Sequence, residues 1–166
     1  MILGMSTATF TFLHVLISLV GIGSGLIVTF GFLSGKRLDG MNTLFLVTTV
    51  ATSVTGFGFP FDHLLPSHKV GIISLVVLAV AIPARYVFHL AGSWRWIYVV
   101  TASIALYLNV FVLVVQCFLK VPALNALAPT QKEPPFLIAQ LLVMAIFIGL
   151  TIFSVKRFHV GPARPA

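Results

Sequence analysis

Five long apolar stretches, separated by short connections, occupy most of this 166-residue chain. A transmembrane helix needs about 20 apolar residues to cross roughly 30 Å of hydrocarbon, and each stretch has about that length. Apolar residues make up 59% of the chain and charged residues 8%, and the mean hydropathy is +1.12. In a soluble domain about a quarter of the residues are charged. The sequence therefore predicts an all-α integral membrane bundle of five transmembrane helices, forming one transmembrane domain over residues 1–166.

The limits of the apolar runs define the predicted spans. These cover about residues 8–33, 42–60, 70–91, 96–119 and 136–155. The first span is interpreted as a retained anchor, because no Lys or Arg precedes it and it exceeds the about 7 to 15 apolar residues of a secretory signal. The longest connection, residues 121–135, contains four prolines and is the best candidate for a lid or a partner-binding segment.

Basic residues predict the orientation of the spans, because short loops rich in Lys and Arg stay in the cytoplasm. One set of alternate connections holds Lys69, Lys120 and Lys132. The other set holds Lys36, Arg37, Arg95, Lys156, Arg157 and Arg164. We therefore expect the N-terminus outside and the C-terminus in the cytoplasm, as in a multipass protein of a bacterial inner membrane.

Other features of the composition exclude several classes of function. The net charge of +7 is spread along the chain and forms no basic block, so no nucleic-acid partner is expected. The only cysteine, Cys117, has no partner in the chain for a disulfide. The sequence has no phosphate-binding loop, nucleophile elbow, zinc-protease motif or covalent-haem motif. We therefore expect a protein without enzymatic activity.

Small and hydroxyl-bearing residues indicate where helices approach closely. Gly21 and Gly25 have GxxxG spacing, which suits close helix packing either within the bundle or across a dimer. The second span has two adjacent polar stripes, typical of a buried central helix, with a polar cavity for a quinone head, an ion or water as the alternative. The stripes contain Thr48, Thr52 and Thr55, and Thr49, Ser53 and Gly56. Asn109 in the fourth span is predicted to bond to another helix.

Histidines form the most informative polar group in the sequence. Under the predicted topology His14, His63 and His68 converge near the outer face, with Asp62 beside them. A haem iron held by two imidazoles needs them at one level on facing helices. The three histidines are therefore candidate ligands of haem b or a quinone, and together with Asp62 they are candidate metal ligands. The alternative is that they are hydrogen-bonded or face lipid headgroups.

On the cytoplasmic side, Arg85 and His89 are four residues apart and are predicted to share one face of the third span. The Arg85 guanidinium either extends to the headgroups or binds a lipid phosphate or another anion. Neither Asp39 nor Glu133 is expected to neutralise Arg85.

Three functional hypotheses follow. The leading one is a non-enzymatic accessory or oligomeric membrane component, in contact with the lipid bilayer, that associates through Gly21 and Gly25. The second is a b-type haem or quinone-linked redox protein with its site at the outer histidines. The third is a small permease or channel that acts as an oligomer and is lined by the second span.

Overall fold

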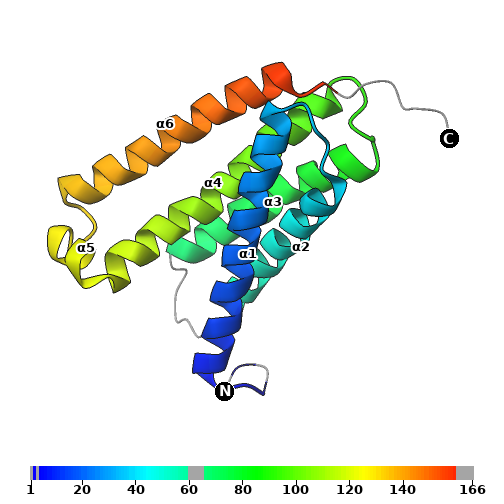
Figure 1. The fold of residues 1–166 in the computed structure, drawn as a ribbon. Helices are drawn as coiled ribbons and strands as arrows, with labels where there is room; N and C mark the ends of the chain where they lie inside the picture. Colours follow the sequence, from blue (N-terminus) through cyan, green and yellow to red (C-terminus); the bar gives the residue numbers. More distant parts are fainter. Residues whose placement is uncertain (1, 3, 60–65, 160–166) are drawn as a thin grey trace.

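A computed structural model describes residues 2, 4–59 and 66–159 of the chain, and this part is a bundle of helices (Figure 1). The elements are α1 (Thr7–Leu33), α2 (Asp39–Thr55), the 3-10 turn η1 (Gly56–Gly58), α3 (Pro66–Tyr86), α4 (Trp94–Lys120), α5 (Pro122–Leu127) and α6 (Pro134–Arg157). The predicted all-helical fold is therefore confirmed for the described residues.

Four helices in the described part, α1, α3, α4 and α6, are long and apolar enough to cross a membrane. The fold is thus compatible with a multipass membrane protein. The remaining long helix, α2, has 17 residues and lies just below the length of a typical span. The count of five spans and the orientation of the termini stay predictions.

The helix limits agree with the predicted spans at α1, α4 and α6, each within two residues at either end. Two helices end five residues before the predicted spans: α2 ends at Thr55 instead of residue 60, and α3 ends at Tyr86 instead of residue 91. His89 and Leu90 adopt left-handed backbone angles, with φ of 49° and 61°. The chain turns here because Leu90 is buried and because the Phe88 ring stacks on Trp94, with 3.9 Å between the ring centroids.

The long helices connect two ends of the bundle. We call one the arginine end, because Arg37, Arg85 and Arg95 lie there, where α1, α3 and α6 finish and α2 and α4 begin. The other is the histidine end, which contains His14 and His68. Consecutive long helices run in opposite directions between the two ends, so residues from distant parts of the sequence meet at the same end.

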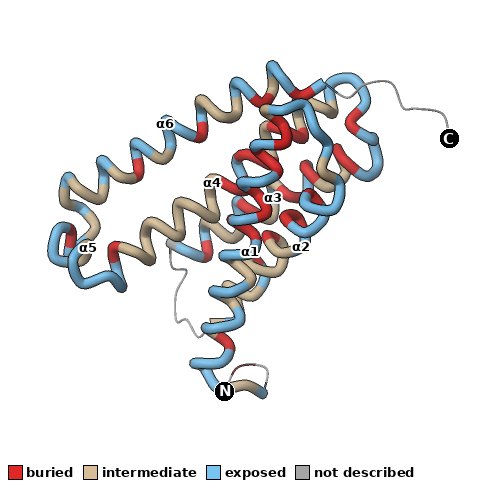
Figure 2. Tube along the Cα trace, viewed as in Figure 1, coloured by how far each residue is buried: buried red, intermediate tan, exposed pale blue. Residues whose placement is uncertain are grey.

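The core lies closer to the arginine end, around the first half of α4, which contacts α1, α2, α3 and α6. Four alanines allow α3 and α4 to approach closely, and each is at most 2% exposed: Ala81, Ala84, Ala102 and Ala105. In contrast, α6 lies along one side of the bundle against α4 and α1 and is mostly exposed, as Figure 2 shows.

Candidate functional site

The best-built polar site is at the arginine end, around the side chain of Arg85 in the last turn of α3. This side chain is only 3% exposed. Its Nη2 donates to Oδ1 of Asp39 at the start of α2. The guanidinium carbon also lies 5.3 Å from the centroid of the Tyr98 ring and 5.7 Å from that of Tyr86, within cation–π range. Arg85 therefore links α3 to both α2 and α4.

A second hydrogen-bond chain extends this site through Asn42, which is 1% exposed. The Tyr98 hydroxyl donates to Asn42 Oδ1. Asn42 Nδ2 donates in turn to the carbonyl oxygens of Arg37 (2.6 Å) and Leu38 (3.1 Å). Leu38 has a left-handed φ of 41°, which leucine rarely adopts. The two hydrogen bonds from Asn42 therefore hold the connection between α1 and α2 in this unfavourable conformation.

The prediction that Asp39 does not neutralise Arg85 is wrong. The sequence shows both residues beside a short connection but does not show how α2 and α3 are rotated about their axes, and the ion pair depends on that rotation. The prediction that His89 shares a helical face with Arg85 is also wrong, because α3 ends at Tyr86 and His89 lies in the turn beyond it. Arg85 is buried rather than extended to the surface, and binding of an anion by these two residues stays a prediction.

A second arginine, Arg95 in the first turn of α4, binds the end of α6 at the same end of the bundle. Arg95 Nη1 donates to the carbonyl oxygen of Phe158 and, over 3.5 Å, to that of Val155. These carbonyls lie at the C-terminus of α6, where the helix dipole favours a cation. Phe158 is fully buried and its ring lies 4.8 Å from the Phe32 ring at the end of α1. Sequence reasoning assigned Arg95 only to the topology signal and missed this contact.

At the histidine end, the rings of His14 and His68 each pack against a nearby aromatic ring. His14 Nδ1 lies 2.8 Å from Thr55 Oγ1, and its ring packs edge-on against Phe59, with centroids 5.2 Å apart. His68 is 3% exposed and stacks on Phe57, with centroids 5.5 Å apart. The two imidazoles therefore lie at the same end of the bundle, each in contact with other side chains.

The other two predicted members of this group, Asp62 and His63, lie outside the described residues. Over residues 4–59 and 66–159, no three His, Cys, Asp or Glu side chains come together as metal ligands would. The haem or quinone site at His14, His63 and His68, and the metal site at these histidines and Asp62, therefore stay predictions.

One of the two polar stripes of α2 faces the interior, where Thr49 and Ser53 are buried and bond to two other helices. Ser53 Oγ donates to Ser74 Oγ on α3 at 3.0 Å. Asn109 Nδ2 on α4 donates to Thr49 Oγ1 at 3.3 Å, so the predicted hydrogen bond between Asn109 and another helix is confirmed. These contacts support the interpretation of α2 as a buried central helix.

The Gly21 and Gly25 face of α1 is occupied within the chain. A Cβ atom on Gly25 would lie 2.6 Å from Leu106 Cδ1 on α4 and 2.8 Å from Phe45 Cδ2 on α2. A Cβ atom on Gly21 would lie 3.1 Å from Thr48 Oγ1. Of the two packing modes predicted for these glycines, the structure shows packing within the bundle. A partner chain therefore does not have this face available, and the predicted route of association needs correction.

Two side-chain hydrogen bonds hold the connection after α4 against the last turns of that helix. Asn125 Nδ2 in α5 donates to the Phe118 carbonyl at 3.1 Å, and Gln131 Nε2 donates to the Val115 carbonyl at 3.0 Å. At Glu133, desolvation raises the pKa of the carboxyl. Hydrogen bonds from the Thr130 hydroxyl and nearby backbone N–H groups outweigh desolvation, so the net effect lowers the pKa. A role for this connection as a lid or partner-binding segment stays a prediction.

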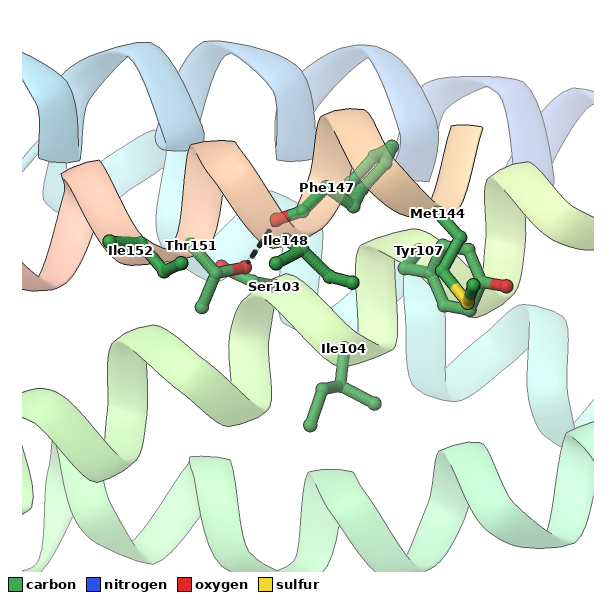
Figure 3. Close-up of a pocket in the computed structure, with 8 residues that line it drawn as sticks. All are labelled: Ser103, Ile104, Tyr107, Met144, Phe147, Ile148, Thr151 and Ile152. Atoms are coloured by element: carbon green, nitrogen blue, oxygen red, sulfur yellow. Dashed lines mark hydrogen bonds between the residues drawn. The ribbon is translucent and has the colours of Figure 1, made fainter. Parts of the chain in front are cut away.

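A shallow groove of about 330 Å³ separates parts of α4 and α6 (Figure 3). Its lining is nearly all apolar and includes Ile104 and Tyr107 from α4 and Phe147 and Ile148 from α6. Three buried polar atoms along this seam have no hydrogen-bond partner within the described part of the chain. They are Ser103 Oγ, Gln140 Oε1 and Ser154 Oγ. The seam is therefore neither fully packed nor fully hydrogen-bonded.

No family model, curated protein or solved structure matches this chain.

Proposed function

We propose that this chain is an integral membrane protein with five transmembrane helices, an outside N-terminus and a cytoplasmic C-terminus, located in a bacterial inner membrane. Large apolar side chains on the outside of the bundle support membrane embedding, among them Phe12 (66% exposed), Val76 (62%) and Ile138 (63%). With η1, α2 extends over residues 39–58. Twenty helical residues rise about 30 Å, close to the thickness of the hydrocarbon layer.

We further propose that the protein is a non-enzymatic component that associates with another transmembrane helix through α6. The observation that carries this proposal is how little of α6 is covered. Only 11% of the most apolar 18-residue segment of α6 is buried, whereas 44% of the corresponding segment is buried in α1 and 39% in α4. The buried positions are Gln140, Phe147 and Ser154, spaced seven apart on a single narrow stripe.

The opposite face of α6 has the features of a helix-packing surface. Ala145 and Gly149 are four residues apart and lie about half a turn from the buried stripe, at 3.6 residues per turn. A Cβ atom added to Gly149 would meet nothing within 4 Å. Small residues with this spacing allow two helix backbones to approach closely in lipid. This face therefore replaces Gly21 and Gly25 as the proposed association surface.

Cysteine crosslinking tests the association. The native cysteine is removed by Cys117→Ser, and Leu142→Cys, on the outer side of α6 and 60% exposed as leucine, is then oxidised in native membranes. The matched control is Val47→Cys on α2, 61% exposed as valine. We expect a crosslinked species only from position 142. Its mass distinguishes a second copy of the chain from a different protein.

A glycine pair supplies the second control. Gly149→Leu is expected to reduce the crosslink at position 142 by about tenfold, because a bulky side chain prevents close approach of the helices. Gly23→Leu places the same side chain on α1, where a Cβ atom also meets nothing within 4 Å, and is expected to have no effect. Equal crosslinking at positions 47 and 142, or an unchanged crosslink in Gly149→Leu, contradicts the association proposal.

A further inference from the structure

Two basic segments from opposite ends of the sequence meet at the arginine end. The Gly35 backbone lies against the end of α6, since a Cβ atom on Gly35 would be 3.8 Å from the Arg157 carbonyl oxygen. The contact between Phe32 and Phe158 joins the same two helix ends. Gly35 has a left-handed φ of 65°, which turns the chain directly before Lys36. The Lys36 backbone consequently lies close to the end of α6, which contains Lys156 and Arg157, although 120 residues separate Lys36 from Lys156 in the sequence.

Most of the other charges at this end already have partners. The Asp39 carboxylate binds Arg85 and also Arg37, whose Nε lies 3.3 Å from Oδ1. The Arg95 guanidinium binds the carbonyls at the end of α6. Glu133 lies at the histidine end, beyond α4.

At the arginine end, three exposed cations have no carboxylate partner among the described residues. We call them the basic corner: Lys36, Lys156 and Arg157.

A favourable interaction with a helix dipole explains two of the three cations in the basic corner, but not the third. Lys156 and Arg157 are in the last turn of α6, where cations are favourable. Lys36 lies beyond the end of α1, whose own last turn contains no basic residue. The fold therefore brings a third cation to the end of α6, where it increases the electrostatic repulsion unless an anion is bound.

The surface next to the basic corner is apolar and exposed. Phe30 on α1 is 63% exposed, and on α6 Ile152 is 48% and Phe153 is 56% exposed. Cations followed along the helix axis by exposed apolar side chains match the order of chemical groups in a phospholipid, with a phosphate followed by acyl chains.

We propose that the basic corner binds the headgroup of an anionic phospholipid, with its acyl chains against the neighbouring apolar surfaces of α1 and α6. Arg85, which sequence reasoning considered for an anion contact, has no part in this site because its side chain is buried against Asp39. The inference rests on the proposed membrane embedding.

Native mass spectrometry of the detergent-solubilised protein, titrated with phosphatidylglycerol, tests this site. The variant Lys36→Gln/Lys156→Gln/Arg157→Gln is compared with a control at the opposite end. That control, Lys69→Gln/Lys120→Gln/Lys132→Gln, removes the same number of charges. We expect phosphatidylglycerol binding about a hundredfold weaker in the first variant at low ionic strength, with each cation contributing about fivefold, and unchanged binding in the control.

Further variants keep the test decisive if the triple variant does not fold. Lys36→Gln alone leaves α6 intact and is expected to weaken binding by about fivefold. Lys36→Arg/Lys156→Arg/Arg157→Lys keeps the charges and is expected to bind like the native protein. Retained binding in Lys36→Gln, or an equal loss in the opposite-end control, overturns the proposal.

Two further arms identify the ligand source and separate this inference from membrane embedding. Competing inorganic phosphate is expected not to displace phosphatidylglycerol, because it lacks acyl chains; full displacement would assign the corner to free phosphate and overturn the lipid site. Washing membranes with alkaline carbonate tests embedding by itself. Release of the chain contradicts embedding, whereas a retained chain without selective phosphatidylglycerol binding contradicts only the inference made here.

Discussion

A buried arginine in an apolar bundle needs several contacts at once, and Arg85 shows how this chain provides them. The Asp39 carboxylate balances its charge and the rings of Tyr86 and Tyr98 cover its faces. Two of its nitrogens, Nε and Nη1, have no hydrogen-bond partner among the described residues, so these contacts carry much of its stabilisation. The position of Arg85 therefore depends strongly on Asp39.

Replacing Asp39 with asparagine is expected to lower the free energy of unfolding by about 1–3 kcal/mol, because the Arg85 guanidinium is then buried without a counter-charge. The loss is smaller than for a fully buried pair, because the Asp39 side chain is 67% exposed. The measurement is the midpoint of thermal unfolding of the purified protein in detergent.

Arg37→Gln is the matched control for this prediction. Arg37 contacts the same carboxylate, but its side chain is 45% exposed, so its loss is expected to cost less than about 1 kcal/mol. Its backbone carbonyl still accepts the hydrogen bond from Asn42. An unfolding midpoint for Asp39→Asn equal to that of Arg37→Gln would show that the buried guanidinium does not depend on Asp39.

The contacts of single residues were predictable from the sequence only where the position of the residue along its own helix determined them. Asn109 lies in the middle of an apolar span, and a deep polar group there requires a partner on another helix, which proved to be Thr49. The partner of Arg85 depends on the relative rotation of two helices, which hydropathy does not specify. For the same reason the sequence identified Gly21 and Gly25 as packing residues without showing what packs on them.

At the scale of elements, α1 shows that glycines in one helix have different roles. Gly25 faces Leu106 and Phe45 at distances too short for a methyl group, whereas Gly23 faces open space. Gly25→Ala is expected to destabilise the bundle by about 1–3 kcal/mol through overpacking. Gly23→Ala is expected to be neutral or slightly stabilising, since alanine favours a helix. Thermal unfolding in detergent measures both.

The two alanine variants also separate packing within the chain from association. If the Gly25 face bound a second copy, Gly25→Ala would change the mass of the assembly measured by light scattering. We expect an unchanged mass, with only the unfolding midpoint lowered. Equal midpoints for the two variants would contradict the close contact of α1 with α2 and α4.

Element limits were predictable from hydropathy to within two residues at α1, α4 and α6. The end of α3 was not, because residues 87–91 are largely apolar and continue the helical pattern. The chain instead turns after Tyr86, and the Phe88 ring stacks on Trp94 at the start of α4. Such contacts depend on the tertiary fold, which a single hydrophobic profile does not contain.

At the scale of the whole molecule, the path of α2 decides how many times the chain crosses a membrane. Ser34 follows α1 at the arginine end, whereas Lys69 lies at the start of α3 beside His68 at the histidine end. The helix that joins these two ends is α2, which lies beside α1 and α3 (Figure 1). Its 17 residues are few for a span, but η1 follows α2 directly and adds three helical residues.

Labelling with a membrane-impermeant maleimide tests the five-span topology, using single cysteines in a Cys117→Ser background. We expect Lys69→Cys and Lys132→Cys to react in intact spheroplasts, and Ser34→Cys to react only after lysis, because α2 carries the chain from the cytoplasmic side to the outer side. Reaction of Ser34→Cys and Lys69→Cys from the same side would show that α2 does not cross, which leaves four spans. Reaction of Ser34→Cys alone in spheroplasts would keep five spans but reverse their orientation, and it would place the basic corner in the outer leaflet.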